Sequence, residues 1–560
     1  MLFNKKRLVN YIERGIFMFL RKSMDMYMKK LLSIILLMAI GLGEAFSQSY
    51  FDDGLDAKFH RERREAFREL MPEKSVAVFF SSPVKNRSND VDFIYHPNTD
   101  LFYLSGFREP NAALVIFDSP VEVDGEMLDE LMFVQPRDEN AEMWNGKRLG
   151  VDGVKDKLGF QQVFLNSEFE KVLEGDFQKF DKVLSFSLNK GIEESNSNKE
   201  LQQMREKFMS AVEYPEDASE VTGQLYELIK TTDIENSANV AQVIGRYRRF
   251  YPEVENNEVL NDFLNADSPE KRMEVRERVP NHKVDIAALP QMMDYLRETK
   301  TSEELAMLKK AIQISAIGQV EVMKALKPGM SEREVQGIHE FVYKRYGAEG
   351  VGYPSIVGAG NNGCILHYIE NDKRDIDKRL ILMDLGAEFR GYTADVTRTI
   401  PISGKFTEEE RLIYDLVYKA QEAGFEQCRP GNDFSEIGKV AQEVINEGLA
   451  ELGIIEKGQR HRYFPHGTSH HLGLDVHDRG TFGTLREGMV LTVEPGIYIP
   501  EGSDCDPKWW GIAVRIEDDV VITGEGYENL SAFAPRSSEE IERMMEQTSV
   551  LEEWVLPELD

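Results

Sequence analysis

Carboxylates placed within apolar, strand-like segments are the feature that most constrains the fold of this chain. Asp384 ends the apolar run 380–383, and Asp395 lies in a second, partly β-branched run, 392–397. If residues 389–390 form the loop of a two-residue hairpin, Asp384 and Asp395 face each other with their Cβ atoms about 5 Å apart. Like charges in that position destabilise a sheet unless a cation lies between them. The alternative is a different register in which both carboxylates face water.

Two further carboxylates occupy the same kind of segment. Glu494 ends the apolar run 489–493, and Glu517 lies within the run 512–522. Arg515 precedes Glu517 by two residues, so the strand period places both on one sheet face. There the guanidinium could orient a metal-binding carboxylate, or the two could form an ordinary ion pair. Asp518 and Asp519 are expected to lie in solvent.

Histidines are concentrated in one short window of the chain. Five of the ten, His461, His466, His470, His471 and His477, lie within 17 residues. The chain has no HExxH and no CxxC motif, which argues against a helical zincin and against a thiolate zinc site. Its three cysteines are too few and too scattered for a disulfide framework. Four carboxylates and a histidine form an oxygen-rich set that could bridge two divalent ions of manganese, cobalt, iron or zinc.

These motifs together resemble the M24 metallopeptidases, whose catalytic domain has the pita-bread fold, and more closely aminopeptidase P. The resemblance implies an α/β (α+β) chain in which a creatinase-like N-terminal domain precedes the catalytic domain. It covers about residues 50–545. The segments that carry it are 98–107, 144–150, 356–368, 466–478 and 493–496.

The resemblance also implies a set of metal ligands. They are Asp384, Asp395, His470, Glu494 and Glu517. Asp384 would bind one ion, while His470 and Glu494 would bind the other. Asp395 and Glu517 would bridge the two ions, which are expected to be Mn²⁺. Two such ions can share a hydroxide that is nucleophilic near neutral pH.

The implied reaction is hydrolysis of the bond between an N-terminal residue and a following proline. Its candidate catalytic residues are Glu494, His466, His477, His367 and Arg515. Glu494 would pass a proton from water to the leaving proline nitrogen. The three histidines would contact the substrate and stabilise the tetrahedral intermediate.

Two nearby residues have open interpretations. His471 is expected to be a packing or rim residue rather than a ligand. Trp144 resembles a residue that closes the substrate pocket of a neighbouring subunit, and the alternative is an ordinary buried tryptophan.

Three related enzymes and one non-catalytic class of protein are alternatives to this interpretation. Prolidase, which acts on Xaa-Pro dipeptides, shares all five ligands. Creatinase has the fold without the ligands, and methionine aminopeptidase lacks the long N-terminal domain. A non-catalytic pita-bread binding module typically loses one or more ligands, and none is lost here.

The start of the chain has the pattern of a secretory signal. Lys29 and Lys30 precede the apolar run 31–43, and small residues follow at positions 45 and 47, the two that a signal peptidase inspects. That run is too short for a permanent membrane span, although a retained anchor is the alternative. Met28 could be the true start, which would make residues 1–27 an over-extended gene prediction. The protein is expected to be exported, to the periplasm or the medium.

The remaining chain is divided by its local patterns. Residues 75–80 and 113–117 are predicted strands, and 193–278 is a charged, helix-forming stretch without an assigned function. A capping box at Thr301 and Glu304 predicts a helix through residues 305–326. We therefore expect a signal peptide at 1–47, an N-terminal domain at 50–295, a catalytic domain at 296–545 and a tail at 546–560.

The net charge of −31 bears on the partners. It argues against nucleic acid and anionic membranes, because both repel such a surface. The expected partners are proline-containing peptides and further copies of the chain, in a dimer or tetramer.

Overall fold

The computed structural model describes residues 54–551, apart from positions 124, 174, 189–195, 216–218 and 378. From Leu55 onward the chain belongs to one compact unit. The predicted signal segment 1–47 and residues 552–560 of the predicted tail lie outside the described residues. Within the described part of the chain, no helix is both long and apolar enough to cross a bilayer.

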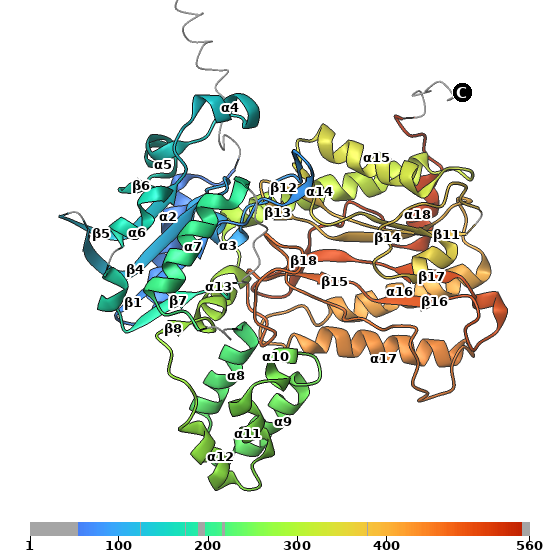
Figure 1. Cartoon of the computed structure of the whole chain (residues 1–560). Coiled ribbons are helices and arrows are strands. Elements are labelled where there is room, and N and C mark those ends of the chain that lie inside the picture. The colour runs from blue at the N-terminus through green and yellow to red at the C-terminus, as the bar shows by residue number, and fades with distance from the viewer. Residues whose placement is uncertain are drawn as a thin grey trace, which may run out of the picture. The chain divides into compact units, whose positions relative to one another are not determined.

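A six-stranded mixed sheet forms the centre of the N-terminal half (Figure 1). Its order is β6-β5-β4-β1-β7-β8, with β1 antiparallel to β4 and parallel to β7. The predicted strands at 75–80 and 113–117 are therefore neighbours. The strands are β1 (Ser75–Phe80), β4 (Ala113–Val123), β5 (Glu126–Val134), β6 (Val163–Leu165), β7 (Lys182–Ser185) and β8 (Val284–Asp285), with a separate hairpin of β2 (Asn86–Ser88) and β3 (Val91–Asp92).

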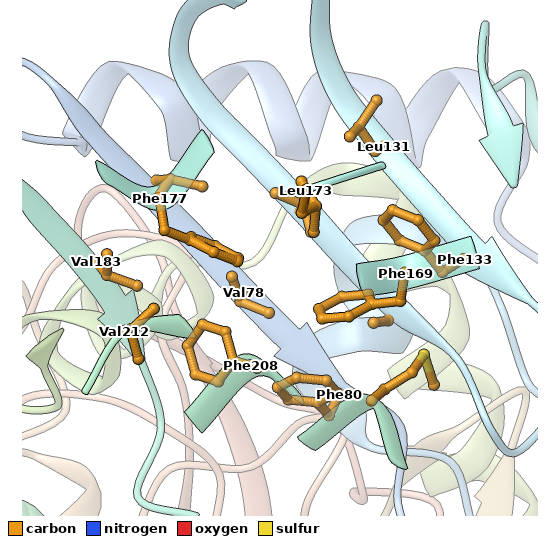
Figure 2. Packing of buried hydrophobic residues seen from close by; sticks show 14 of the residues in the cluster. Val78, Phe80, Leu131, Phe133, Phe169, Leu173, Phe177, Val183, Phe208 and Val212 are labelled. Atoms are coloured by element: carbon orange, nitrogen blue, oxygen red, sulfur yellow. The ribbon is translucent and has the colours of Figure 1, made fainter. Parts of the chain in front are cut away.

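Helices cover both faces of this sheet. Every residue of β1 is therefore buried. Adjacent strand residues point to opposite faces. Phe80 packs edge to face against Phe208 on one side, and Phe79 packs against Phe67 on the other. Figure 2 shows the Phe80 side of this core, where aromatic rings from several helices gather over the strands. The helices are α2 (Ala57–Leu70), α3 (Thr99–Ser105), α4 (Glu139–Asn145), α5 (Gly150–Leu158), α6 (Phe169–Val172) and α7 (Lys199–Ala211).

The charged stretch at 193–278, which has no assigned function, folds largely into a small helical bundle. This bundle forms a separate lobe in Figure 1. Its helices bury a separate cluster of apolar residues that includes Leu225, Ile244, Leu260 and Phe263. The elements are α8 (Glu220–Thr231), α9 (Ser237–Tyr247), α10 (Pro252–Glu255), α11 (Glu258–Asn265) and α12 (Pro269–Arg276), and α13 (Ala288–Glu298) follows them.

In the C-terminal half, short antiparallel sheets lie between two pairs of helices (Figure 1). Helices α14 and α15 pack together on one side, and α16 and α17 pack together on the other. The helices are α14 (Ser302–Ala325), α15 (Glu332–Arg345), α16 (Glu408–Phe425), α17 (Ser435–Glu451) and α18 (Ser538–Met545). The strands are β9 (Gly350–Val351), β10 (Ile356–Ala359), β11 (Leu380–Leu385), β12 (Ala387–Phe389), β13 (Tyr392–Thr393), β14 (Val396–Pro401), β15 (Val490–Val493), β16 (Gly496–Ile499), β17 (Ile512–Arg515), β18 (Asp518–Ile522) and β19 (Tyr527–Asn529).

The predicted start of α14 is confirmed by its capping contacts. The Thr301 hydroxyl accepts from the Glu304 amide at 3.3 Å, and the Glu304 carboxylate accepts from the Thr301 amide at 3.0 Å. This reciprocal pair satisfies two helix-end donors. The helix ends at Ala325, shortly before Pro328 and Gly329.

Candidate metal centre

One cavity of about 650 Å³ brings together every site residue predicted from the sequence. A volume of this size is within the usual range for a small-molecule or peptide site. The predicted residues in its lining are His367, Asp384, Asp395, His466, His470, His477, Glu494, Arg515 and Glu517. Residues more than a hundred positions apart therefore meet in a single site.

The predicted register of the first carboxylate pair is wrong. Phe389 pairs with Tyr392, so Arg390 and Gly391 form the loop, and Asp384 lies opposite Thr397 rather than Asp395. Both loop residues have positive φ, 52° at Arg390 and 87° at Gly391. Two-residue hairpins favour this mirror-image turn, and glycine adopts its second position without strain. The glycine therefore moves the loop by one residue.

Asp384 and Asp395 nevertheless meet, on a diagonal of the strand pair. The Tyr353 hydroxyl lies 2.5 Å from Oδ1 of Asp384 and 2.5 Å from Oδ1 of Asp395. Both carboxylates are buried, with 8% and 5% of their surface exposed. The alternative in which both face water is therefore excluded. Tyr353 was not among the predicted site residues, because no periodic pattern in the sequence marks it.

Arg515 orients a different carboxylate from the one predicted. Its guanidinium forms an ion pair with Asp384 and donates to the Tyr498 hydroxyl at 2.9 Å. Glu517 instead accepts from the Thr397 hydroxyl at 2.6 Å, and Arg515 reaches the same hydroxyl at 3.3 Å. The hydrogen-bond link from the arginine to Glu517 therefore runs through Thr397, while the charge of Arg515 also acts directly to lower the pKa of Glu517.

His470 presents its Nε2 atom to two carboxylates. Its Nδ1 lies 3.0 Å from the backbone carbonyl of His471, which places the ring proton on Nδ1 and leaves Nε2 free to bind a metal. Nε2 lies 3.6 Å from Asp395 and 3.6 Å from Glu494, beyond hydrogen-bond length. Asp395, His470 and Glu517 each offer one possible ligand atom, and these three atoms lie within 4.8 Å of one another.

Electrostatics in the site favour a bound cation. Burial and the Asp384 carboxylate hold the pKa of Asp395 well above its ordinary value. Burial and Asp395 do the same for Glu517, and burial raises the pKa of Glu494 to about 7. Burial would also raise the pKa of Asp384, but the charge of Arg515 and the hydrogen bonds that Asp384 makes together outweigh it, and the pKa is lowered. Three carboxylates thus lack a compensating charge, and the donor set fits divalent metal ions.

Two buried glutamines anchor the backbone beside the carboxylates. The Gln319 side chain of α14 donates to the carbonyls of Met383 and Val396, at 3.1 and 2.7 Å. These residues adjoin Asp384 and Asp395.

The second glutamine repeats this arrangement on the other side. The Gln421 side chain of α16 donates to the carbonyls of Val493 and Ile516, at 3.0 and 3.2 Å. These residues adjoin Glu494 and Glu517. Neither glutamine was among the predicted site residues, because each makes its contacts with distant parts of the chain.

The other histidines differ in their surroundings. Nε2 of His466 lies 2.7 Å from the Tyr498 hydroxyl, and burial lowers the pKa of His466 to about 4. The His477 ring lies 4.3 Å from that of His470, centroid to centroid. His367 and His477 are exposed where they line the cavity.

His471 is a packing residue, one of the two roles expected for it. It is fully buried, and its Nε2 lies 2.8 Å from the Thr481 carbonyl. Its ring packs against Phe434 and Phe482.

The solvent-exposed placement predicted for Asp518 and Asp519 is wrong. Both are fully buried. Asp518 forms an ion pair with the buried Arg398, and Asp519 accepts from the backbone amide of Asp395 at 3.1 Å. Burial of Asp518 is possible because the guanidinium neutralises it.

The alternative of an ordinary buried Trp144 is also wrong. Its side chain lies on α4 with 84% of its surface exposed. Met143 beside it is 78% exposed. Contact with a neighbouring subunit remains a prediction.

Comparison with known proteins agrees with this fold. Residues 60–184 match the N-terminal domain of aminopeptidase P, and residues 306–524 match metallopeptidase family M24. Xaa-Pro aminopeptidase of Escherichia coli is 35% identical over 505 residues, which cover 87% of this chain and 97% of that relative. The Haemophilus influenzae enzyme of the same name is 32% identical over 503 residues, with the same two coverages.

Solved structures show the same similarity. Proline aminopeptidase P II from Yersinia pestis superposes with a TM-score of 0.69 at 31% identity, covering 88% of this chain and 99% of the other. Aminopeptidase P from E. coli with the inhibitor Pro-Leu gives 0.68 at 32% identity, with the same coverages.

The fold and site together define a pita-bread metallopeptidase. The chain belongs to the aminopeptidase P group of metallopeptidase family M24. The predicted family, the predicted fold class and the prediction of a hydrolase are therefore confirmed.

Proposed function

We propose that this hydrolase is an Xaa-Pro aminopeptidase that uses two divalent metal ions, with Mn²⁺ the expected metal. The observation that carries the proposal is the group of four carboxylates and His470 around one cavity. Three of the carboxylates are buried, Glu494 is partly exposed, and three of the four have raised pKa values. The relatives named Xaa-Pro aminopeptidase support the substrate class.

Asp384, Asp395, His470, Glu494 and Glu517 surround the cavity and would together hold the two ions. When bound, the ions would polarise the substrate carbonyl and lower the pKa of water enough to supply a nucleophile.

The side chains around the ligands position the substrate and move protons. Glu494 is placed to take a proton at its carboxylate and to deliver it to the proline nitrogen, which must be protonated to leave. Nδ1 of His466 lies 3.6 Å from the Glu494 carboxylate. His477 and His367 line the same cavity, where they can donate to the oxygen that gains charge in the transition state. Arg515 keeps Asp384 ionised and oriented.

Product analysis separates this function from its nearest alternative. The metal-loaded protein should release one N-terminal residue from an Xaa-Pro-Xaa tripeptide, as read by mass spectrometry. Cleavage of an Xaa-Pro dipeptide alone would make the protein a prolidase. No cleavage of either peptide would favour the non-catalytic module.

We also propose that the chain is exported and forms a dimer or tetramer. The signal-like pattern at 29–47 supports export, and the exposed Trp144 and Met143 support contact between subunits. Cell fractionation and light scattering test these two points. Cytosolic localisation or a monomer would contradict them.

A further inference from the structure

Arg297 lies at the centre of a buried ionic cluster outside the candidate metal centre. Its side chain, near the end of α13, is 1% exposed. The guanidinium contacts three carboxylates from two places in the chain, Asp100 in one and Asp475 with Asp478 in the other. A buried arginine with several carboxylate partners is well suited to hold separate segments in fixed positions.

Two of these carboxylates flank a segment that enters the active-site cavity. Nη2 of Arg297 donates to Asp475 at 2.9 Å and also to Asp478. Between the two aspartates lie Val476 and His477, which both line the cavity. One guanidinium nitrogen therefore holds both ends of the segment that presents His477.

The cluster leaves little room for the segment to shift. Nζ of Lys300 donates to the second carboxylate oxygen of Asp478 at 2.7 Å. A Cβ atom at Gly473 would lie 2.0 Å from this oxygen and 3.0 Å from Nζ of Lys300. The backbone at Gly473 is thus packed directly onto the ionic cluster.

The N-terminal half supplies the other wall of the cluster. Nη1 of Arg297 donates to Asp100 of α3 at 2.7 Å. The neighbouring Thr99 hydroxyl donates to Asp475 at 2.8 Å and lies 3.1 Å from Nη1. Helix α3 therefore contacts both Arg297 and the segment that Arg297 holds.

The His477 side chain itself has little to fix it. It is exposed, and among the described residues its ring forms no hydrogen bond. Its ring contact is with His470. The position of the imidazole therefore depends on the backbone of residues 475–478.

We propose that Arg297 is a positioning residue that sets His477 relative to the metal ligands, through its ion pairs with Asp475 and Asp478. This proposal rests on the proposed function for its kinetic readout. Helix α3 takes part through Asp100 and Thr99, so the N-terminal half contributes to catalysis without reaching the cavity.

The effect should fall on kcat more than on KM. His477 is placed to interact with charge that develops in the transition state, and such interactions raise kcat rather than substrate affinity. A misplacement of about 1 Å can lower a rate about 100-fold. Arg297 and its aspartates do not line the cavity, so they should have little direct effect on substrate binding.

The decisive variant is D475A, because Asp475 is 43% exposed and Arg297 keeps its other two carboxylates. We expect kcat to fall at least about tenfold, KM to stay within about twofold and metal content to be unchanged. R297M should lower kcat further, and R297K should recover part of the loss because lysine keeps the charge without the fork.

The control is R68M in the N-terminal half. Arg68 bonds to Glu130 and to the Phe117 carbonyl, away from the 475–478 segment. This variant should lower the melting temperature and leave kcat unchanged at temperatures well below it. Should R297M fail to fold, D475A still decides the matter.

A second readout does not depend on turnover. The His477 Cε1–H signal in a ¹H–¹³C spectrum should move in D475A and stay in place in R68M. An unmoved signal, or a kcat for D475A within twofold of wild type, overturns the positioning role. A wild type that turns over no Xaa-Pro peptide refutes the proposed function instead, and the spectrum then tests the positioning role alone.

Discussion

Gln319 and Gln421 make equivalent hydrogen bonds to the backbone on opposite sides of the candidate metal centre. Each is fully buried within a long helix, and each donates to two backbone carbonyls beside two different candidate ligands. One glutamine therefore ties Asp384 to Asp395, and the other ties Glu494 to Glu517. The spacing within each ligand pair is set by a helix as well as by the strands.

Replacing either glutamine should weaken metal binding. Q421M leaves the carbonyls of Val493 and Ile516 without their donor, which costs about 1–3 kcal/mol per buried group. Loss of such supporting contacts typically lowers metal affinity about 10–100-fold. Competition with a chelator measures this affinity. Q313M is the control, because Gln313 is exposed on α14, and equal affinities for Q313M, Q421M and wild type would contradict the anchoring role.

Asp395→Asn should stabilise the metal-free protein. Burial and Asp384 raise the folded-state pKa of Asp395. The folded protein therefore holds this proton more tightly than the unfolded chain. This contribution to folding stability is complete below the unfolded pKa of about 3.9 and is lost as the pH rises towards the folded pKa. At pH 8 the amide removes the cost of burying this charge, so the variant should have the larger free energy of unfolding.

Thermal melts in EDTA at pH 8 measure this effect. The variant should melt above wild type in EDTA and gain less than wild type from Mn²⁺, because the stabilisation from a bound metal scales with its affinity. A lower melting temperature for the variant in EDTA would refute the electrostatic account.

Glu494→Gln should lower turnover about 10²–10⁴-fold and keep the fold. The amide has nearly the same shape but cannot carry the proton, and general acid–base catalysis contributes about 10²–10⁴-fold. Steady-state kinetics, with circular dichroism as the folding control, measures both effects. Unchanged turnover in a folded E494Q would contradict the assigned proton transfer.

Acid should weaken the ionic cluster around Asp478. Burial acts to raise the pKa of Asp478, but Arg297 and Lys300 outweigh it and lower the pKa to about 2. A depressed folded-state pKa contributes stability above the unfolded pKa of about 3.9, and this stability is lost as pH falls towards 2.

Urea unfolding of the metal-free protein from pH 6 to pH 3 tests this dependence. D478N should be less stable than wild type at pH 6 by about 3–5 kcal/mol, because it leaves the buried Lys300 without its ion-pair partner and removes one of the three carboxylates on Arg297. The difference should shrink at pH 3. A constant difference across this range would show that the charge of Asp478 is not responsible.

Local patterns predicted the strands and helix starts well. The buried run at 75–80 forms β1, and the capping box at Thr301 begins α14. These features depend on residues close in sequence. The hairpin register was predicted wrongly because the position of the loop depends on which residues accept a positive φ. A loop at 389–390 leaves out Gly391, the residue that adopts a positive φ most easily.

The rest of the site depends on contacts between distant residues. Tyr353 lies 31 and 42 positions from the two aspartates that it joins, and Arg297 lies 178 positions from Asp475. No periodic signal marks such residues. Asp518 was placed in solvent because its partner, Arg398, lies 120 positions away.

Cleavage of two matched peptides tests the central claim most directly. One peptide has proline in the second position, the other has alanine, and both are incubated with the metal-free protein before and after Mn²⁺ is added. The account predicts release of a single N-terminal residue from the proline peptide alone, and only with the metal. Equal cleavage of both peptides, or cleavage of the proline peptide in EDTA, would contradict it.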